Sequence, residues 1–102
     1  MGSVKYVTYA QKSLLMDDDT AEWLLEYARA LGTIDGTDTV KLAAISPSGH
    51  QIEVTLLLNR GSELMMESAD DSIAAPVNDE AVRYMQDRTR LIVSPPSVQP
   101  EL

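Results

Sequence analysis

The stretch that decides the fold is residues 13–32, SLLMDDDTAEWLLEYARALG, where an apolar run meets three aspartates and then a helical pattern. After Asp19, apolar side chains recur every three to four residues, which predicts a helix over residues 19–31. Gly32 stands where a residue in the left-handed conformation commonly ends a helix. The stretch therefore predicts a short strand, residues 13–16, followed by a helix that Gly32 terminates.

The three aspartates are candidates for a metal site, for catalytic acids, or for the start of that helix. They are poorly spaced as calcium ligands, because a calcium loop uses alternate residues and a glycine at its sharp turn. Asp19 and Glu22 have the spacing of a capping box, and Asp17 or Asp18 is an alternative N-cap. Their charge also suits the positive end of a helix dipole. We interpret the run as a helix start and predict no metal site.

The predicted helix is apolar over a wide arc. Glu22, Glu26 and Arg29 fill one narrow polar wedge. The remaining arc covers about 220°, against roughly 100° for an ordinary surface helix. Since one sheet face cannot cover that arc, Trp23 and Tyr27 are expected to meet a second element. The sequence leaves two choices for it, a C-terminal helix or another subunit.

Strand patterns lie on both sides of the helix. Residues 4–9 precede it, with a break at 10–12, and residues 39–46, 51–58 and 63–68 follow it. Pro47 and Gly49 form a turn between the first two of these later segments, and NRGS, residues 59–62, links the second to the third. Because such short links join antiparallel neighbours, we expect the three later strands to form a meander.

A second helix is expected from about Asn78 to Ile92, with its apolar stripe at Ala81, Val82, Met85 and Ile92. The predicted fold is α+β in the order β-β-α-β-β-β-α. A mostly antiparallel sheet of four to five strands packs on the first helix, and the second helix is C-terminal. We expect a single domain over residues 1–93 and a Pro-rich flexible tail over residues 94–102.

The sheet is predicted to be apolar on both faces. Alternation in residues 51–58 places four apolar side chains toward the first helix: Ile52, Val54, Leu56 and Leu58. Leu57 and Met65 fall on the opposite face, with Ala43 and Ile45 beside them. Either the second helix or a partner should cover that face. The candidate interface is therefore the following set: Trp23, Tyr27, Ala30, Leu57 and Met65.

Composition excludes several classes of function. The 102 residues carry a net charge of −8, which repels nucleic acid phosphates and anionic lipid. No apolar run approaches the roughly 20 residues of a membrane span. The absence of Cys removes disulfides, thiolate chemistry and the usual zinc clusters. We expect a cytoplasmic protein that binds neither nucleic acid nor membranes.

No catalytic, cofactor-binding or metal-ligating residue is predicted. The single histidine, His50, lies in a turn, where it reads as an exposed residue unless Ser46, Ser48 or another serine completes a triad. The first hypothesis is a non-enzymatic interaction or regulatory module that binds itself as a homodimer, or binds another protein.

Two alternatives remain open. One is a small-ligand binder or minor enzyme with a pocket between helix and sheet, lined by Tyr6, Tyr9, Trp23 or Tyr27. The other is an acidic inhibitor or mimic that binds a basic partner, because residues 17–26 and 63–80 contain acids and no base.

Overall fold

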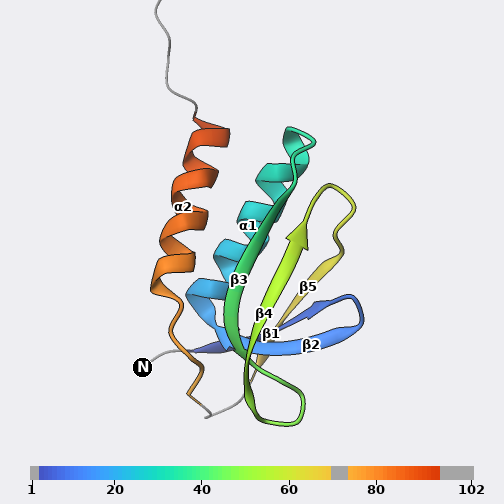
Figure 1. The fold of residues 1–102 in the computed structure, drawn as a ribbon, viewed down its shortest axis with the longest axis vertical. Helices are drawn as coiled ribbons and strands as arrows, with labels where there is room; N and C mark the ends of the chain where they lie inside the picture. The colour runs from blue at the N-terminus through green and yellow to red at the C-terminus, as the bar shows by residue number, and fades with distance from the viewer. Residues whose placement is uncertain (1–2, 70–73, 95–102) are drawn as a thin grey trace, which may run out of the picture.

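A computed structural model describes residues 3–69 and 74–94 of the chain. Its elements are β1 (Val4–Tyr9), β2 (Lys12–Asp17), α1 (Asp18–Thr33), β3 (Asp38–Ile45), β4 (Gln51–Leu58), β5 (Leu64–Ala69) and α2 (Asp79–Val93) (Figure 1). The strands form one five-stranded sheet in the order β4-β3-β2-β1-β5, and all neighbours are antiparallel. The predicted α+β fold and its element order are confirmed. The predicted tail lies almost entirely outside the described residues.

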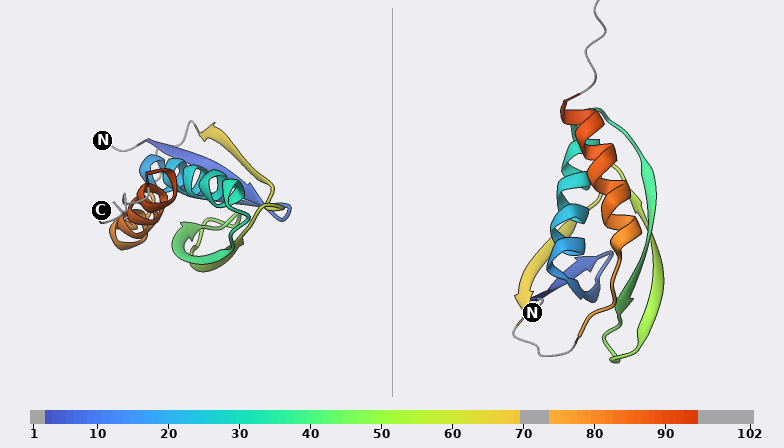
Figure 2. Two further views of the ribbon diagram at one scale, coloured as in Figure 1. Left: turned by 90° about the horizontal axis from the view of Figure 1, so that it is seen from above. Right: turned by 90° about the vertical axis from the view of Figure 1, so that its left-hand side faces the viewer.

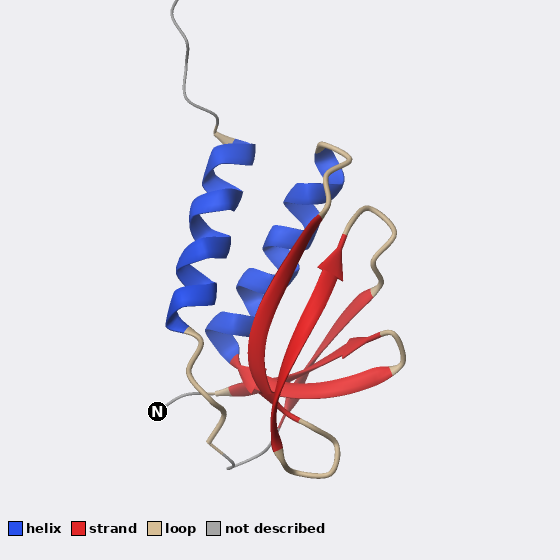
Figure 3. Cartoon of the chain, viewed as in Figure 1, coloured by secondary structure: helices blue, strands red, loops and turns tan. Residues whose placement is uncertain are grey.

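The sheet is bent into a trough that holds α1. Viewed from above, α1 lies between the limb made by β1 and β5 and the limb made by β3 and β4 (Figure 2). In the part of the chain that the structure describes, β2 and β3 pair at one position, Leu15 with Ile45, and this pair joins the two halves of the sheet. The second helix lies beside α1 on the outer side, as the two blue helices show in Figure 3. The molecule thus has a helix enclosed by a sheet and a second helix against its flank.

The predicted meander is correct for β3 and β4 and wrong for β5. The β3–β4 hairpin forms as expected, and Gly49 has the positive φ of 90° that its turn requires. However, β5 pairs with β1 over its whole length. The bend of the trough brings the two outer edges of the sheet near each other, so residues 59–63 can link β4 to β5 without pairing them. There the Tyr9 hydroxyl donates a hydrogen bond to the main-chain oxygen of Leu57.

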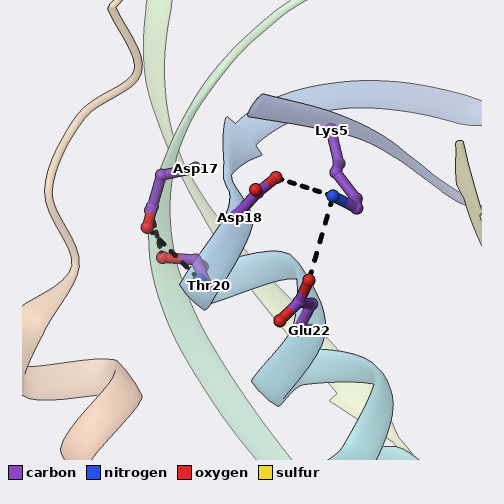
Figure 4. A network of polar contacts seen from close by, with 5 residues as sticks. All are labelled: Lys5, Asp17, Asp18, Thr20 and Glu22. Carbon is purple, nitrogen blue, oxygen red and sulfur yellow. Dashed lines mark hydrogen bonds and ion pairs between the residues drawn. The ribbon is translucent and has the colours of Figure 1, made fainter. Parts of the chain in front are cut away.

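Asp17 is the N-cap of α1. Its side chain accepts hydrogen bonds from the Thr20 main-chain N–H, at 3.4 Å, and from the Thr20 hydroxyl (Figure 4). The expected capping box of Asp19 and Glu22 is therefore wrong, because the helix begins at Asp18 and moves Glu22 past the position that faces the cap. The alternative N-cap at Asp17 is confirmed, and the aspartates act as a helix start.

The first turn of α1 is also tied to β1. Lys5 Nζ donates to Asp18 Oδ1 at 2.7 Å and lies 3.8 Å from Glu22 Oε2 (Figure 4). The hydrogen bond to Asp18 is the main cause of a raised pKa at Lys5. These contacts orient the helix across the strand.

The end of α1 differs from the prediction. Gly32 lies inside the helix, which continues to Thr33, and Asp35 adopts the left-handed conformation with a φ of 54°. The main-chain N–H of Gly36 donates to the oxygen of Leu31 at 2.9 Å, the bond that closes a Schellman motif. Asp tolerates this conformation better than most residues, and so the expected glycine terminator was misplaced by three residues.

The main core fills the trough. Its fully buried side chains are Val7, Leu14, Met16, Ala21, Leu24, Tyr27, Leu31, Val40, Leu42, Ala44, Leu56, Leu58 and Met85. Ile52 and Val54 pack against it, so the predicted inner face of β4 meets this core. A smaller cluster of Val4, Leu15 and Ile45 lies on the outer face of the sheet. Aliphatic burial on this scale is the main source of stability.

Candidate functional site

A surface groove of about 650 Å³ lies between β3 and the first half of α2. One side is made by residues 39–43 of β3 with Glu53 of β4, and the other by residues 77–81 and Tyr84. Both elements are tied together at each end of the groove. These ties keep α2 against the edge of the sheet and set the shape of the groove.

The groove contains an open stretch of strand edge. At the hairpin the Ser46 N–H donates to the His50 oxygen at 2.8 Å, so in this register the even-numbered residues of β3 bond to β4. The main-chain N–H and oxygen of the odd-numbered residues point the other way, toward the groove. On that side β2 reaches β3 only at Ile45. Within residues 3–69 and 74–94, no hydrogen bond reaches the main chain of Lys41 from the groove side.

Asn78 closes one end of the groove. Its side-chain oxygen accepts from the main-chain N–H of Ala43 at 2.8 Å, and its side-chain nitrogen donates to the oxygen of Ala43 at 2.9 Å. The carboxamide thereby takes the place of a neighbouring strand. Although Asn78 stands at the N-cap position of α2, its side chain makes no capping bond to its own helix. It links the start of α2 to β3.

Asp38 closes the other end. Its Oδ2 accepts hydrogen bonds from the Tyr27 hydroxyl of α1 and, at 2.5 Å, from the Tyr84 hydroxyl of α2. Its Oδ1 accepts from the Thr39 main-chain N–H at 2.8 Å. The two tyrosine rings meet edge to face, with centroids 6.2 Å apart. One carboxylate therefore joins both helices to the start of β3.

The electrostatics of this junction favour an ionised aspartate. Partial burial acts to raise the pKa of Asp38, but hydrogen bonds from Tyr27 and Tyr84 and the nearby charge of Arg88 outweigh it, and the pKa is lowered. Burial and the hydrogen bond to Asp38 raise the pKa of Tyr27. Asp38 is thus a charged acceptor and Tyr27 a neutral donor at neutral pH. These hydrogen bonds therefore serve to hold α1, α2 and the start of β3 together.

Acidic side chains dominate the walls of the groove. Glu53, Asp79 and Glu80 line it, and all three are exposed. Lys41 is the one basic side chain among the lining residues. The three carboxylates lie near the Asn78 end of the groove: Asp79 and Glu80 are in the first turn of α2, and Glu53 pairs with Ala43, to which Asn78 bonds.

The structure separates the five predicted interface residues. Tyr27 and Ala30 are buried in the monomer, and Trp23 packs half-buried against the core. The aromatic contact with Tyr84 shows that α2 covers Tyr27, one of the two choices left open. Leu57 and Met65 remain exposed, at 47% and 52% of their surface. Of the five residues, Leu57, Met65 and part of Trp23 therefore lie at the surface.

Side chains predicted for a ligand pocket are also scattered. Tyr9 lines a second hollow of about 600 Å³ between the β1–β2 turn and the β4–β5 link. Tyr6 lies on the surface of β1, and Tyr27 is in the core. These side chains do not meet in one cavity.

His50 lies in the β3–β4 turn, as expected, and is exposed. Its Nδ1 lies 3.0 Å from the Ser48 hydroxyl, which lies 2.8 Å from the Ser46 hydroxyl. All these contacts stay within one surface turn. Among the described ranges, no three His, Cys, Asp or Glu side chains gather closely enough to hold a metal ion.

The groove residues were not among the sequence predictions. Asp38 belongs to the turn-rich TIDGTD segment, and Asn78 marks only the start of a helix. Tyr84 lies outside the apolar stripe of α2. The one available signal was the bonding pattern of an antiparallel hairpin, in which every second residue of β3 bonds to β4 and the residues between direct their N–H and oxygen away from it. It could not show that the outward edge would lack a partner strand.

Comparison of the chain with protein families, with curated proteins and with solved structures found no match. Within the described part of the chain, no helix has the length and apolar character needed to cross a bilayer.

Proposed function

We propose that this protein is a protein-interaction module that binds a segment of another polypeptide in the groove between β3 and α2. The observation that carries the proposal is the open main chain of Lys41 inside a groove whose two ends are held by hydrogen bonds. An unpaired strand edge offers a donor and an acceptor in a fixed arrangement, which another main chain matches.

Asn78 supports this assignment of the edge. Its carboxamide presents the same donor and acceptor as a peptide group, and it binds Ala43 through both. The next outward-facing residue, Lys41, has the same pair of main-chain groups and faces the groove. A peptide group of a bound segment would therefore extend the pattern that Asn78 begins.

The test is a selection of random peptides, displayed on phage, against the immobilised full chain. Bound peptides are then mapped by amide chemical-shift changes in the ¹⁵N-labelled protein. We expect enriched peptides whose largest shifts fall on residues 39–43 and 77–84. Failure to enrich any peptide, or shifts confined to other surfaces, would contradict the proposal.

A second candidate function is homodimerisation, favoured by the exposure of Leu57 on β4 and Met65 on β5, the two outer strands of the sheet. Sedimentation equilibrium should then show a dimer that Leu57→Glu with Met65→Glu dissociates. Leu91→Glu with Val93→Glu is the matched control, because it places the same charges at exposed apolar sites of α2. A monomer at all concentrations would exclude this candidate.

A further inference from the structure

The chemistry of the groove narrows the kind of segment that fits it. We infer that the groove binds an extended segment rich in lysine or arginine, which pairs with β3 through the main chain of Lys41. This inference rests on the proposed function, because it names the partner of the same groove. Its two independent supports are the geometry of the open edge and the charge of the walls.

The geometry favours a short extended segment. On the groove side of β3, the Ala43 main chain is satisfied by Asn78, and the Thr39 N–H is satisfied by the Asp38 side chain. Lys41 lies between them, and no residue in the described ranges bonds to its main-chain N–H or oxygen. The distance from Asp38 to Ala43 along a strand is roughly 17 Å at about 3.3 Å per residue. The segment would therefore lie extended over a few residues, with its centre at Lys41.

The charge selects against acidic segments. Glu53 lies on the sheet side of the groove, and Asp79 and Glu80 lie on the helix side, so a bound segment has carboxylates on both flanks. Lys41 is the only opposing charge among the lining residues. Basic side chains that alternate along an extended segment would reach these carboxylates, while acidic ones would be repelled. The net charge of −8 adds a longer-range attraction.

The direct experiment measures binding of three synthetic peptides to the full chain at low salt by calorimetry and amide chemical shifts. The first is Ac-KVKVKV-NH2, the second is Ac-EVEVEV-NH2, and the third has the sequence of the first with alternate main-chain nitrogens methylated. We expect the first to bind at residues 39–43 and the second not to bind. The third should bind about tenfold more weakly, because methylation removes the strand-pairing donors and keeps the charge.

A pair of proline variants tests the strand edge itself. Lys41→Pro removes the N–H that faces the groove, while β3 keeps its bonds to β4 because those come from even-numbered residues. Thr55→Pro is the matched control: Thr55 is paired directly with Lys41, and its N–H faces the opposite edge of the sheet. We expect Lys41→Pro to weaken binding of Ac-KVKVKV-NH2 about fivefold and Thr55→Pro to change it less than twofold.

A pair of charge variants keeps the inference testable if proline disturbs the fold. Glu53→Lys with Glu80→Lys reverses two groove charges, whereas Glu63→Lys with Glu67→Lys makes the same change at exposed sites outside the groove. The first pair should weaken binding about tenfold relative to the second pair. Equal loss in both pairs, or equal binding of the methylated peptide, would overturn the inference.

The outcomes also separate this inference from the proposed function. Peptides that map to the groove but are neutral or acidic would overturn the basic segment and leave the interaction module standing. A chain that binds no peptide in the groove at all would overturn both.

Discussion

α1 and α2 have almost the same length, 16 and 15 residues, but they are held in different ways. Six residues of α1 are buried, its N-cap is formed by its own preceding residue, and strands lie on both sides of it. In α2 only Met85 and Thr89 are buried, and the side chain at its N-cap position bonds to β3 instead. α1 is enclosed by the core, whereas α2 lies on its flank and contributes Met85 to the core.

This difference matters because α2 forms one wall of the groove. Local stability follows buried apolar contact, and elements with little of it open most readily. The helix that forms this wall of the proposed binding site is therefore held less strongly than α1, through Met85 and its partly buried neighbours Ala81 and Ile92, through Asn78 and through the junction at Asp38.

The largest effect is expected in α1. Leu24→Ala should lower the free energy of unfolding by about 3 kcal/mol, because Leu24 is fully buried and its truncation leaves a cavity. Chemical denaturation measures this loss. Leu25→Ala, at the neighbouring exposed position, is the control and should cost less than about 1 kcal/mol. Similar losses in the two variants would show that α1 is not enclosed as described.

The second-largest loss of stability is expected at the junction formed by Asp38. Asp38→Ala is expected to cost about 2 kcal/mol at pH 7, because the buried Tyr27 hydroxyl loses its acceptor. The pKa of Asp38 is lowered from 3.8, so the stabilisation from its ionised form is present above that pH and is lost as the pH falls through the lower, folded-state pKa.

Denaturation at a series of pH values tests this sign. The stability difference between the wild type and Asp38→Asn should be constant above about pH 5 and shrink as the pH falls toward 2. A difference that grows in acid would contradict the assignment of Asp38 as an ionised acceptor.

Loss of the Asn78 side chain, which links α2 to β3, should lower stability by a smaller amount and act more locally. Asn78→Ala is expected to cost about 1–2 kcal/mol, because it leaves the Ala43 N–H and oxygen without their partner. Amide hydrogen exchange should accelerate in α2 more than in α1. Asn59→Ala, which removes a side-chain bond to Gly61 in the β4–β5 link, serves as the control and should leave exchange in α2 unchanged.

The smallest expected effect is an increase in stability. Gly32→Ala should raise stability by about 0.5–1 kcal/mol, because Gly32 lies within α1 and an added Cβ meets nothing within 4 Å. Gly36→Ala is the contrasting variant, since its Cβ would lie 3.1 Å from a Leu31 methyl. Thermal unfolding should rise for the first variant and not for the second. A loss at Gly32 would show that the helix ends earlier than Thr33.

Local features of the fold could be predicted from sequence because each depends on neighbouring residues. The turn at Gly49 and the alternation of β4 need only a few adjacent positions, and the N-cap falls among the three aspartates, at one of the two alternatives to the favoured capping box. The start and end of α2 were predicted within one residue, from the apolar stripe around Met85. The same local reasoning misplaced the end of α1, because both Gly32 and Asp35 suit a helix terminus and only the packed structure selects between them.

The candidate site could not be predicted, because its contacts join distant segments. Asn78 bonds to Ala43, and Tyr84 reaches Asp38, across 35 and 46 positions of sequence. Neither contact leaves a periodic pattern. The length of the β4–β5 link showed that these strands end close together, but pairing depended on the bend of the whole sheet. That bend placed β5 beside β1.

The pairing of β1 with β5 also has a consequence for how the chain is made. It joins residue 4 to residue 69, while the β1–β2 and β3–β4 hairpins join near neighbours. Contacts between distant residues carry a large loop-closure entropy and form slowly. During synthesis both hairpins and α1 can therefore form before β5 has left the ribosome. Until then the outer edge of β1 stays exposed, and it is the edge where a nascent chain is most open to pairing with the wrong strand.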